Sequence, residues 1–342
     1  MKRWSIVLMA AALLLFARAG WQNQKEIGWY CQGISLRYAE PLAPGAAAAA
    51  QQKNPGLTFW CQQKTVLSAG NTTVEVAGLF YLGDAVLVWG QPCIKGAMPG
   101  PLECRGCALS TAAADSLFGS ENVVGLELVC EDTSYVVCGV FESSVPMALL
   151  PNAGASFTAV ELPATEQARQ NPDTWAAAVL RATGLPEPDW RLCPFEWQGL
   201  AQFVIWLPFC FAALLLVRAT FQAAVRRSAV CRDILLFFVL LTLVIALPVL
   251  LQSLPQWLIP TRWSDFAWWK QTFTQLTIHL LAWLRVPPVN RDVCVKTCLL
   301  LQLGMAAIQG ALCEMLRCSL TQPPANGANL ELLDNAAQEQ PD

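Results

Sequence analysis

Charged residues are scarce in this sequence and unevenly distributed along it. Asp, Glu, Lys and Arg make up 14% of the 342 residues, whereas soluble domains carry about a quarter. The formal net charge of −3 also leaves no basic surface of the kind that nucleic-acid binding requires. We therefore predict no nucleic-acid partner, and the positions that lack charge become the main guide to the architecture.

Catalytic groups are equally scarce. His279 is the single histidine and has no titratable partner within reach along the sequence, so Ser–His and Cys–His catalysis have little support. The chain also lacks the G-x-x-x-x-G-K-[ST] phosphate-binding loop, which argues against an ATPase. We predict that the protein is not an enzyme and that it has no catalytic residue, no cofactor and no metal site.

The missing charge is concentrated in apolar segments near both ends of the chain. A transmembrane helix needs roughly 20 apolar residues, and the runs 200–217 and 234–251 meet that length. The run 295–315 is weaker, and a buried helix of a soluble region is the alternative there. Residues 1–21 fit either a cleaved signal peptide or an uncleaved membrane anchor, because a basic start precedes an apolar run and an A-x-A-like site.

Arginines between the apolar runs indicate how the chain crosses the membrane. Loops rich in Lys and Arg stay in the cytoplasm, and four arginines separate the second run from the third: Arg218, Arg226, Arg227 and Arg232. This places residues 22–196 outside the cytoplasm and the acidic tail 318–342 inside it. We predict an integral, multi-pass cell-membrane protein with about four transmembrane helices, three of them in a membrane domain at 197–317.

The outer segment has the mixed signals of an α/β domain. Ser110 is a good N-cap for a helix over 111–118, which Gly119 ends. Asp173 is predicted to cap a second helix, over 174–183. Runs of β-branched and apolar residues between turn signals predict strands around both helices.

A β-hairpin is predicted directly after the first of these helices, with strands at 124–130 and 135–141. The four residues between them are a common hairpin connection. In this register Cys130 faces Tyr135 and Cys138 faces Glu127. The two cysteines are then three positions out of register, so we do not expect a disulfide between them.

This helix and hairpin, CALSTAAADSLFGSENVVGLELVCEDTSYVVCGVFES at 107–143, resemble part of the extracytoplasmic core domain of MacB/FtsX-type ABC transporter permeases. The motif consists of packing and turn residues, so it indicates a fold rather than a reaction. Its support extends over about residues 60–140, while the rest of the chain agrees in layout. The residues that carry the resemblance are Leu117, Phe118, Gly119, Gly125, Tyr135 and Gly139.

The resemblance implies an uncleaved anchor at 1–21, a separate cytoplasmic ABC ATPase as energy source, and a membrane unit that works as a homo- or heterodimer. Two departures from the family pattern put the ATPase in doubt. The cytoplasmic link at 218–233 has only 16 residues, fewer than is usual in the family. The link at 252–294 is long, whereas the family is brief at this point.

That long link contains an amphipathic pattern near 264–285. Nearby tryptophans and an apolar stripe are typical of a helix that lies in the membrane interface, with the lipid bilayer as its partner. Packing of the same helix against the base of the outer domain is the alternative. The stripe consists of Phe266, Trp269, Phe273, Leu276, Leu280 and Trp283 or Leu284.

Cysteines are numerous, and eight of the 14 lie in the outer segment: Cys31, Cys61, Cys93, Cys104, Cys107, Cys130, Cys138 and Cys193. An even number in an oxidising compartment allows structural disulfides, and free buried cysteines are the alternative. Cys104 and Cys107 form a C-x-x-C next to Arg105, an arrangement that lowers thiol pKa values. The pair lies in a predicted loop rather than at the start of a helix, and no second C-x-x-C completes a zinc site.

Three functions follow from these patterns. The first is a permease-like membrane subunit of an ABC-type transporter or mechanotransmission complex, which couples the outer domain to the membrane helices. The second is a stand-alone, membrane-anchored surface binding protein that has lost ATPase coupling. The third is a membrane thiol oxidoreductase built on Cys104 and Cys107.

Overall fold

The computed structural model describes residues 2–225 and 264–321, and between them only 230, 233–234, 236–238, 240–241, 244 and 262. The predictions for most of the span at 234–251, for Arg226, Arg227 and Arg232, and for the tail beyond 321 lie outside the described residues. Clustering of contacts divides the chain into two compact units. The larger comprises Asn23–Gln202 and Leu251–Leu300, and the smaller comprises Met1–Gln22, Phe203–Leu250 and Leu301–Asp342.

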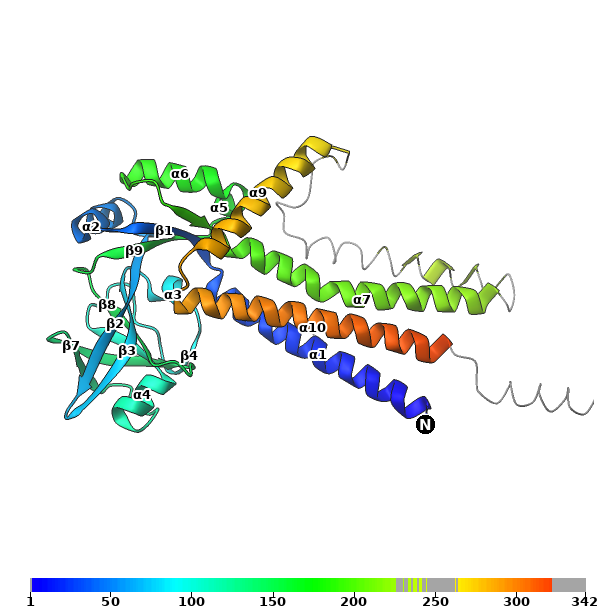
Figure 1. Ribbon diagram of the computed structural model, residues 1–342, viewed down its shortest axis with the longest axis horizontal. Helices are drawn as coiled ribbons and strands as arrows, with labels where there is room; N and C mark the ends of the chain where they lie inside the picture. The colour runs from blue at the N-terminus through cyan, green and yellow to red at the C-terminus, as the bar shows by residue number, and fades with distance from the viewer. Residues whose placement is uncertain are drawn as a thin grey trace, which may run out of the picture. The chain divides into compact units, whose positions relative to one another are not determined.

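The larger unit is built on a ten-stranded mixed sheet (Figure 1). The strand order is β10-β1-β9-β2-β3-β8-β5-β7-β4, and β6 pairs with both β2 and β7. The β3–β8 and β5–β7 pairs are parallel. The strands are β1 (Gly33–Leu42), β2 (Thr58–Ala69), β3 (Thr72–Leu82), β4 (Cys93–Gly96), β5 (Gly106–Ser110), β6 (Glu127–Cys130), β7 (Thr133–Phe141), β8 (Met147–Pro151), β9 (Phe157–Pro163) and β10 (Trp190–Leu192).

Helices of two kinds accompany the sheet. Six lie entirely within the larger unit: α2 (Pro44–Lys53), α3 (Ala85–Val88), α4 (Thr111–Phe118), α5 (Glu166–Gln170), α6 (Pro172–Thr183) and α9 (Phe266–Arg285). Three longer helices are shared by the two units: α1 (Lys2–Tyr30), α7 (Pro194–Val225) and α10 (Asn290–Thr321).

Both faces of the central sheet are buried along β5, β8 and the second half of β3, which explains why these segments read as continuous apolar runs rather than as alternating ones. Phe59 and Cys61 of β2 belong to clusters that pack under α2, α5 and α6 at one end and under α4 at the other (Figure 1). Trp60, between them in the sequence, points to the opposite face. There it packs with Tyr30 of α1 and Val295 of α10.

The helix predicted at 111–118 is α4, and its caps are those predicted. Ser110 Oγ accepts a hydrogen bond from the Ala113 amide, and Gly119 ends the helix in the left-handed region at φ 69°. Leu117 is buried in the cluster beneath the sheet, and Phe118 packs against that cluster. The sequence therefore determines this element through its cap residues and one apolar face.

The predicted hairpin is present, but its predicted register was wrong by two residues. Cys130 pairs with Thr133, and Leu128 rather than Cys130 faces Tyr135. The turn contains only Glu131 and Asp132, whose φ angles of 47° and 65° match a two-residue turn with both residues left-handed. The Glu-Asp sequence at this turn lacks the Asn-Gly signal that such a turn usually carries.

Two other predictions about this domain have different outcomes. The cap of α6 is Asn171 rather than Asp173, because the helix begins at Pro172 and places Asp173 within its first turn. The eight outer cysteines are free thiols. The structure therefore supports the alternative of free cysteines over disulfides.

The smaller unit contains parts of α1, α7 and α10. Within it, the Cys313 thiol of α10 donates a hydrogen bond to the Pro208 carbonyl of α7, at 3.7 Å. Among the described residues, the segment Asn290–Cys318 is the one helix that is long and apolar enough to cross a membrane. The predicted span at 295–315 lies inside it, while the spans predicted at 1–21, 200–217 and 234–251 stay predictions.

Gly139 provides a test of this packing. A Cβ atom at this position of β7 would lie 2.4 Å from the Ala97 carbonyl oxygen, next to the end of β4. We expect Gly139→Ala to lower the free energy of unfolding by about 1–3 kcal/mol, because the backbone around it must shift. The change is measured by urea unfolding of the full chain in detergent, followed by tryptophan fluorescence.

Gly100→Ala is the matched control, since a Cβ there meets no atom within 4 Å. It should change the unfolding free energy by less than about 0.5 kcal/mol. Equal effects of the two substitutions would contradict the described approach of β4 to β7.

Candidate functional site: a buried charge joint and the His279 cluster

Four charged side chains are buried together where the start of α10 meets the sheet. Arg291 Nη1 lies 2.6 Å from Glu161 Oε1, and both side chains are at most 3% exposed. Arg37 Nη2 lies 3.0 Å from Asp292 Oδ1. We call these four residues the charge joint. Its two positive and two negative charges balance, as buried charges generally must.

The strand pattern explains why these charges point inward. Ile34, Leu36 and Tyr38 of β1 belong to the cluster under α2 and α6. Ser35 and Arg37, which alternate with them, therefore face the other side of the sheet. In β9 the same alternation places Glu161 on that side too. The side chains of Arg37 and Glu161 therefore meet the first turn of α10 from two adjacent strands.

Trp60 is the centre of the charge joint. Its indole Nε1 donates a hydrogen bond of 2.9 Å to Glu161 Oε1, and the Ser35 hydroxyl donates to the same oxygen at 2.6 Å. The Arg37 guanidinium lies 4.4 Å from the Trp60 ring centroid, in cation–π geometry. Arg291 Nη2 also donates to the Tyr30 carbonyl at 2.9 Å, which joins the end of α1 to the same network.

Such a network is stable only while all of its members are present. Removing one partner of a buried ion pair leaves an uncompensated charge and costs about 3–5 kcal/mol. Within the larger unit, the charge joint therefore connects the end of α1 and the start of α10 to strands β1, β2 and β9. A displacement of the first turn of α10 must be accompanied by a displacement of β1 and β9, or the charges are separated.

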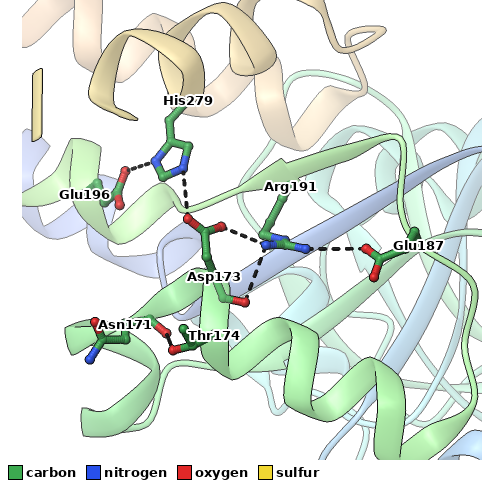
Figure 2. Close-up of polar contacts among 7 residues, drawn as sticks. All are labelled: Asn171, Asp173, Thr174, Glu187, Arg191, Glu196 and His279. Carbon is green, nitrogen blue, oxygen red and sulfur yellow. Dashed lines mark hydrogen bonds and ion pairs between the residues drawn. The ribbon is translucent and has the colours of Figure 1, made fainter. Parts of the chain in front are cut away.

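A second polar cluster surrounds His279 on α9 (Figure 2). Nδ1 of His279 lies 2.9 Å from Glu196 Oε2, at the start of α7, and Nε2 lies 3.9 Å from Asp173 Oδ2, at the start of α6. Asp173 also accepts a hydrogen bond of 2.7 Å from Arg191 Nη1 in β10. Both ring nitrogens of the histidine thus face carboxylates.

The carboxylates around His279 shift the pKa values of His279 and of the nearby Cys193. The hydrogen bond with Glu196 raises the pKa of His279 above its ordinary value, because it favours the charged imidazolium. Burial raises the pKa of the Cys193 thiol well above the ordinary value, and the nearby charges of Glu196 and Asp173 raise it further. The positive charge of Arg191 lowers the pKa by less than these effects raise it, so Cys193 is a neutral thiol at pH 7.

The donor atoms of Cys193, Glu196 and His279 all lie within 4.8 Å of one another. Next to them is a cavity of about 410 Å³, whose wall includes Asp173, Glu196 and His279. This thiol, carboxylate and imidazole are donor types that hold metal ions in proteins. No metal site was predicted from the sequence, where His279 lies 83 residues from Glu196.

Helix α9 has one face that packs against the protein and one that is exposed and apolar. On one face, besides His279, Trp283 stacks on Trp197 with the ring centroids 5.6 Å apart. His279 also contacts Asp173 and Glu196 of the outer segment, and α9 lies against β10, which supports the alternative prediction that the helix packs against the base of the outer domain. The opposite face exposes large apolar side chains, as an interfacial helix requires: Phe266, Phe273, Leu280, Leu281 and Leu284.

The predicted thiol pair is placed in two different environments. Cys104 is exposed, in the loop that precedes β5. Cys107 is buried within β5, and its pKa is raised by burial, which opposes thiolate formation. The thiol of Cys138 lies beside this loop and contacts Glu103 Oε1 at 3.3 Å.

Two further motif residues, Gly125 and Tyr135, lie next to β6 and within β7. Gly125 adopts a left-handed φ of 89° before β6, and the Tyr135 hydroxyl donates a hydrogen bond to the Pro151 carbonyl at 3.3 Å. The charge joint was not predicted from the sequence. Its available signals were the polar Ser35, Arg37 and Glu161 within apolar strands.

Part of this chain is similar to solved protein domains. No family model and no curated protein matches the chain. It is similar to the extracellular domain of the noncanonic ABC-type transporter YknZ from Gram-positive bacteria, with 13% identity over 46% of this chain and 97% of that one, at a TM-score of 0.36. It is also similar to the periplasmic region of MacB from Actinobacillus actinomycetemcomitans, with 13% identity over 47% of this chain and 87% of that one, at a TM-score of 0.38. Both are domains of the kind that the sequence motif resembles.

The charge joint leads to a stability prediction. Glu161→Gln removes the charge that Arg291 faces, and we expect it to lower the free energy of unfolding by about 3–5 kcal/mol. Urea unfolding of the full chain in detergent measures the loss.

Lys64→Met is the control for this change. Lys64 pairs with Glu75 at 3.2 Å on the exposed surface of the β2–β3 hairpin, and such pairs contribute about 0–1 kcal/mol. A loss in Glu161→Gln no larger than in this control would mean that the joint is not a stabilising network.

The thiol environments lead to a reactivity prediction. In the folded chain we expect maleimide to modify Cys104 rapidly and Cys107 only after unfolding, since Cys107 is buried and its thiol stays protonated. Mass spectrometry of digested, labelled protein measures both rates. Rapid labelling of Cys107 in the folded chain would contradict this prediction and support a redox role for Cys104 and Cys107.

Proposed function

We propose that this chain is a permease-like membrane subunit of an ABC-type transporter or mechanotransmission complex, in which the charge joint carries movement between the outer sheet and α10. The observation that supports this most directly is the Arg291–Glu161 contact at 2.6 Å. It fastens the start of the candidate membrane helix Asn290–Cys318 to a strand of the outer domain. The chain itself is not an enzyme in this proposal.

The direction of coupling follows from what each part offers. The outer domain supplies a rigid sheet with both faces buried, suited to responding as one body when an extracytoplasmic partner or substrate binds. Arg291 and Asp292 lie within the first turn of α10, so a change in the sheet moves the helix directly. A separate cytoplasmic ABC ATPase would use the same connection in the opposite direction.

Membrane attachment in this proposal involves α9 as well as the spans. The helix is fixed to the domain by His279 and Trp283, while the face with Phe273 and Leu284 is exposed. It ends at Arg285, five residues before α10 begins at Asn290. A helix of this composition beside a membrane span is suited to lie in the bilayer interface. The outer domain then lies outside the cytoplasm, on a cell-membrane protein.

A stand-alone surface binding protein is the second candidate function. The sequence favours it at one point, because the link at 218–233 is short where family permeases contact the ATPase. The two functions differ in whether an ATPase accompanies the chain and in whether the charge joint affects its turnover.

The test is affinity purification of the full chain from the membranes of cells that express it naturally, followed by ATPase measurement in lipid nanodiscs. We expect a cytoplasmic ABC ATPase to copurify. Asp292→Asn should then leave the amount of copurified ATPase unchanged and lower ATP hydrolysis by roughly 5- to 150-fold, as expected for a lost coupling energy of 1–3 kcal/mol. Its isosteric side chain keeps the packing while it removes the charge that Arg37 faces.

Glu75→Gln is the matched control, because it removes a carboxylate from an exposed pair of the same sheet. Recovery of no ATPase would refute the transporter role and favour the surface binding protein. Recovery of an ATPase whose turnover Asp292→Asn does not change would refute transmission through the joint.

A further inference from the structure

Cys193, Glu196 and His279 present three different donor groups at one point of the larger unit. Cys193 lies between β10 and α7, Glu196 in the first turn of α7, and His279 in the middle of α9. Cys193 and Glu196 are buried, and the His279 side chain is 14% exposed. Three elements thus bring a thiol, a carboxylate and an imidazole to within 4.8 Å of one another.

We propose that these three residues bind a zinc ion, which clips α9 to the start of α7. In a tetrahedral zinc site with bonds of 2.0–2.3 Å, neighbouring donor atoms lie about 3.3–3.7 Å apart. The observed spread of up to 4.8 Å and the 2.9 Å between Nδ1 and Oε2 bracket that spacing. Small side-chain rotations are enough to close the site.

The donor set favours zinc over the hard cations. Mg²⁺ and Ca²⁺ take oxygen ligands almost exclusively, whereas zinc accepts sulfur, nitrogen and oxygen together. Binding displaces the Cys193 thiol proton, which leaves to solvent, so that a thiolate, an imidazole and a carboxylate face the divalent cation. The divalent cation thereby stabilises the buried thiolate directly.

The surroundings of His279 fit this role. A histidine that binds a metal through one ring nitrogen usually donates the other N–H to a carboxylate, which fixes the orientation of the ring. Nδ1 faces Glu196, and Nε2 faces Asp173 Oδ2 at 3.9 Å (Figure 2). Arg191 holds Asp173 in place through the 2.7 Å hydrogen bond. Asp173 is therefore a positioning residue for the proposed ligand.

The site has three protein ligands and an adjoining cavity. Zinc sites with three protein ligands keep their fourth position for water or another small ligand, and the 410 Å³ cavity borders both Glu196 and His279. The clip therefore has one exchangeable position. This inference does not depend on the proposed transport function.

The test uses the full chain, purified in detergent through a tag that contains no histidine, and Zn²⁺ alone as the probe. After incubation with zinc and removal of excess metal, elemental analysis should find about one zinc per chain. Cys193→Ser should lose it, and Asp173→Asn should bind it on the order of 10- to 100-fold more weakly. Cys104→Ser, which alters an exposed cysteine, should retain it.

Cobalt replacement keeps the test decisive if a variant folds poorly. Co²⁺ bound by the wild-type chain should give a thiolate-to-cobalt charge-transfer band, and this band should be absent from Cys193→Ser. Zinc should also raise the unfolding temperature of the wild-type chain and leave that of Cys193→Ser unchanged. A chain that takes up no zinc contains only the His279–Glu196 ion pair, and this result would overturn the proposal. Full retention of zinc by Cys193→Ser would overturn it as well.

Discussion

The ion pair between Glu161 and Arg291 is the interaction on which the larger unit depends. Both charges lie in an apolar environment, so each is tolerable only because the other is there. Ser35 and Trp60 donate hydrogen bonds to Glu161 Oε1, and Arg291 Nη2 donates one to the Tyr30 carbonyl, while Glu161 Oε2 has no hydrogen-bond partner among the described residues. Segments from the beginning, middle and end of the chain therefore have to come together before any of these charges can be buried.

This constraint also gives the two faces of the sheet different purposes. The face toward α2, α4 and α6 is apolar and is closed by helices from within the domain. The opposite face combines aromatic side chains with the charge joint, and it receives the ends of α1 and α10. Both faces contribute buried apolar side chains, and the second face also connects the sheet to the long helices.

Local signals were enough to predict α4, whose cap residues and boundaries agree with the structure. They also predicted the hairpin after it but not its register, because Glu131 and Asp132 both adopt left-handed conformations, which are uncommon for residues other than glycine and rarer for Glu than for Asp. Neither cluster of charged residues was predicted from the sequence. Glu161 and Arg291 are 130 positions apart, and His279 meets Glu196 only when α9 folds back onto the domain. Periodicity reveals which side of a strand is polar, but not which distant residue will neutralise it.

Arg291 and Asp292, two consecutive residues in the first turn of α10, restrict how this helix can move relative to the sheet. Successive side chains project about 100° apart around a helix axis, and here Arg291 is held by β9 while Asp292 is held by β1. A helix fastened at one point can still turn about its own axis. One fastened at two such points cannot, unless the strands slide past each other. Torque on α10 would therefore reach the sheet as shear between β1 and β9.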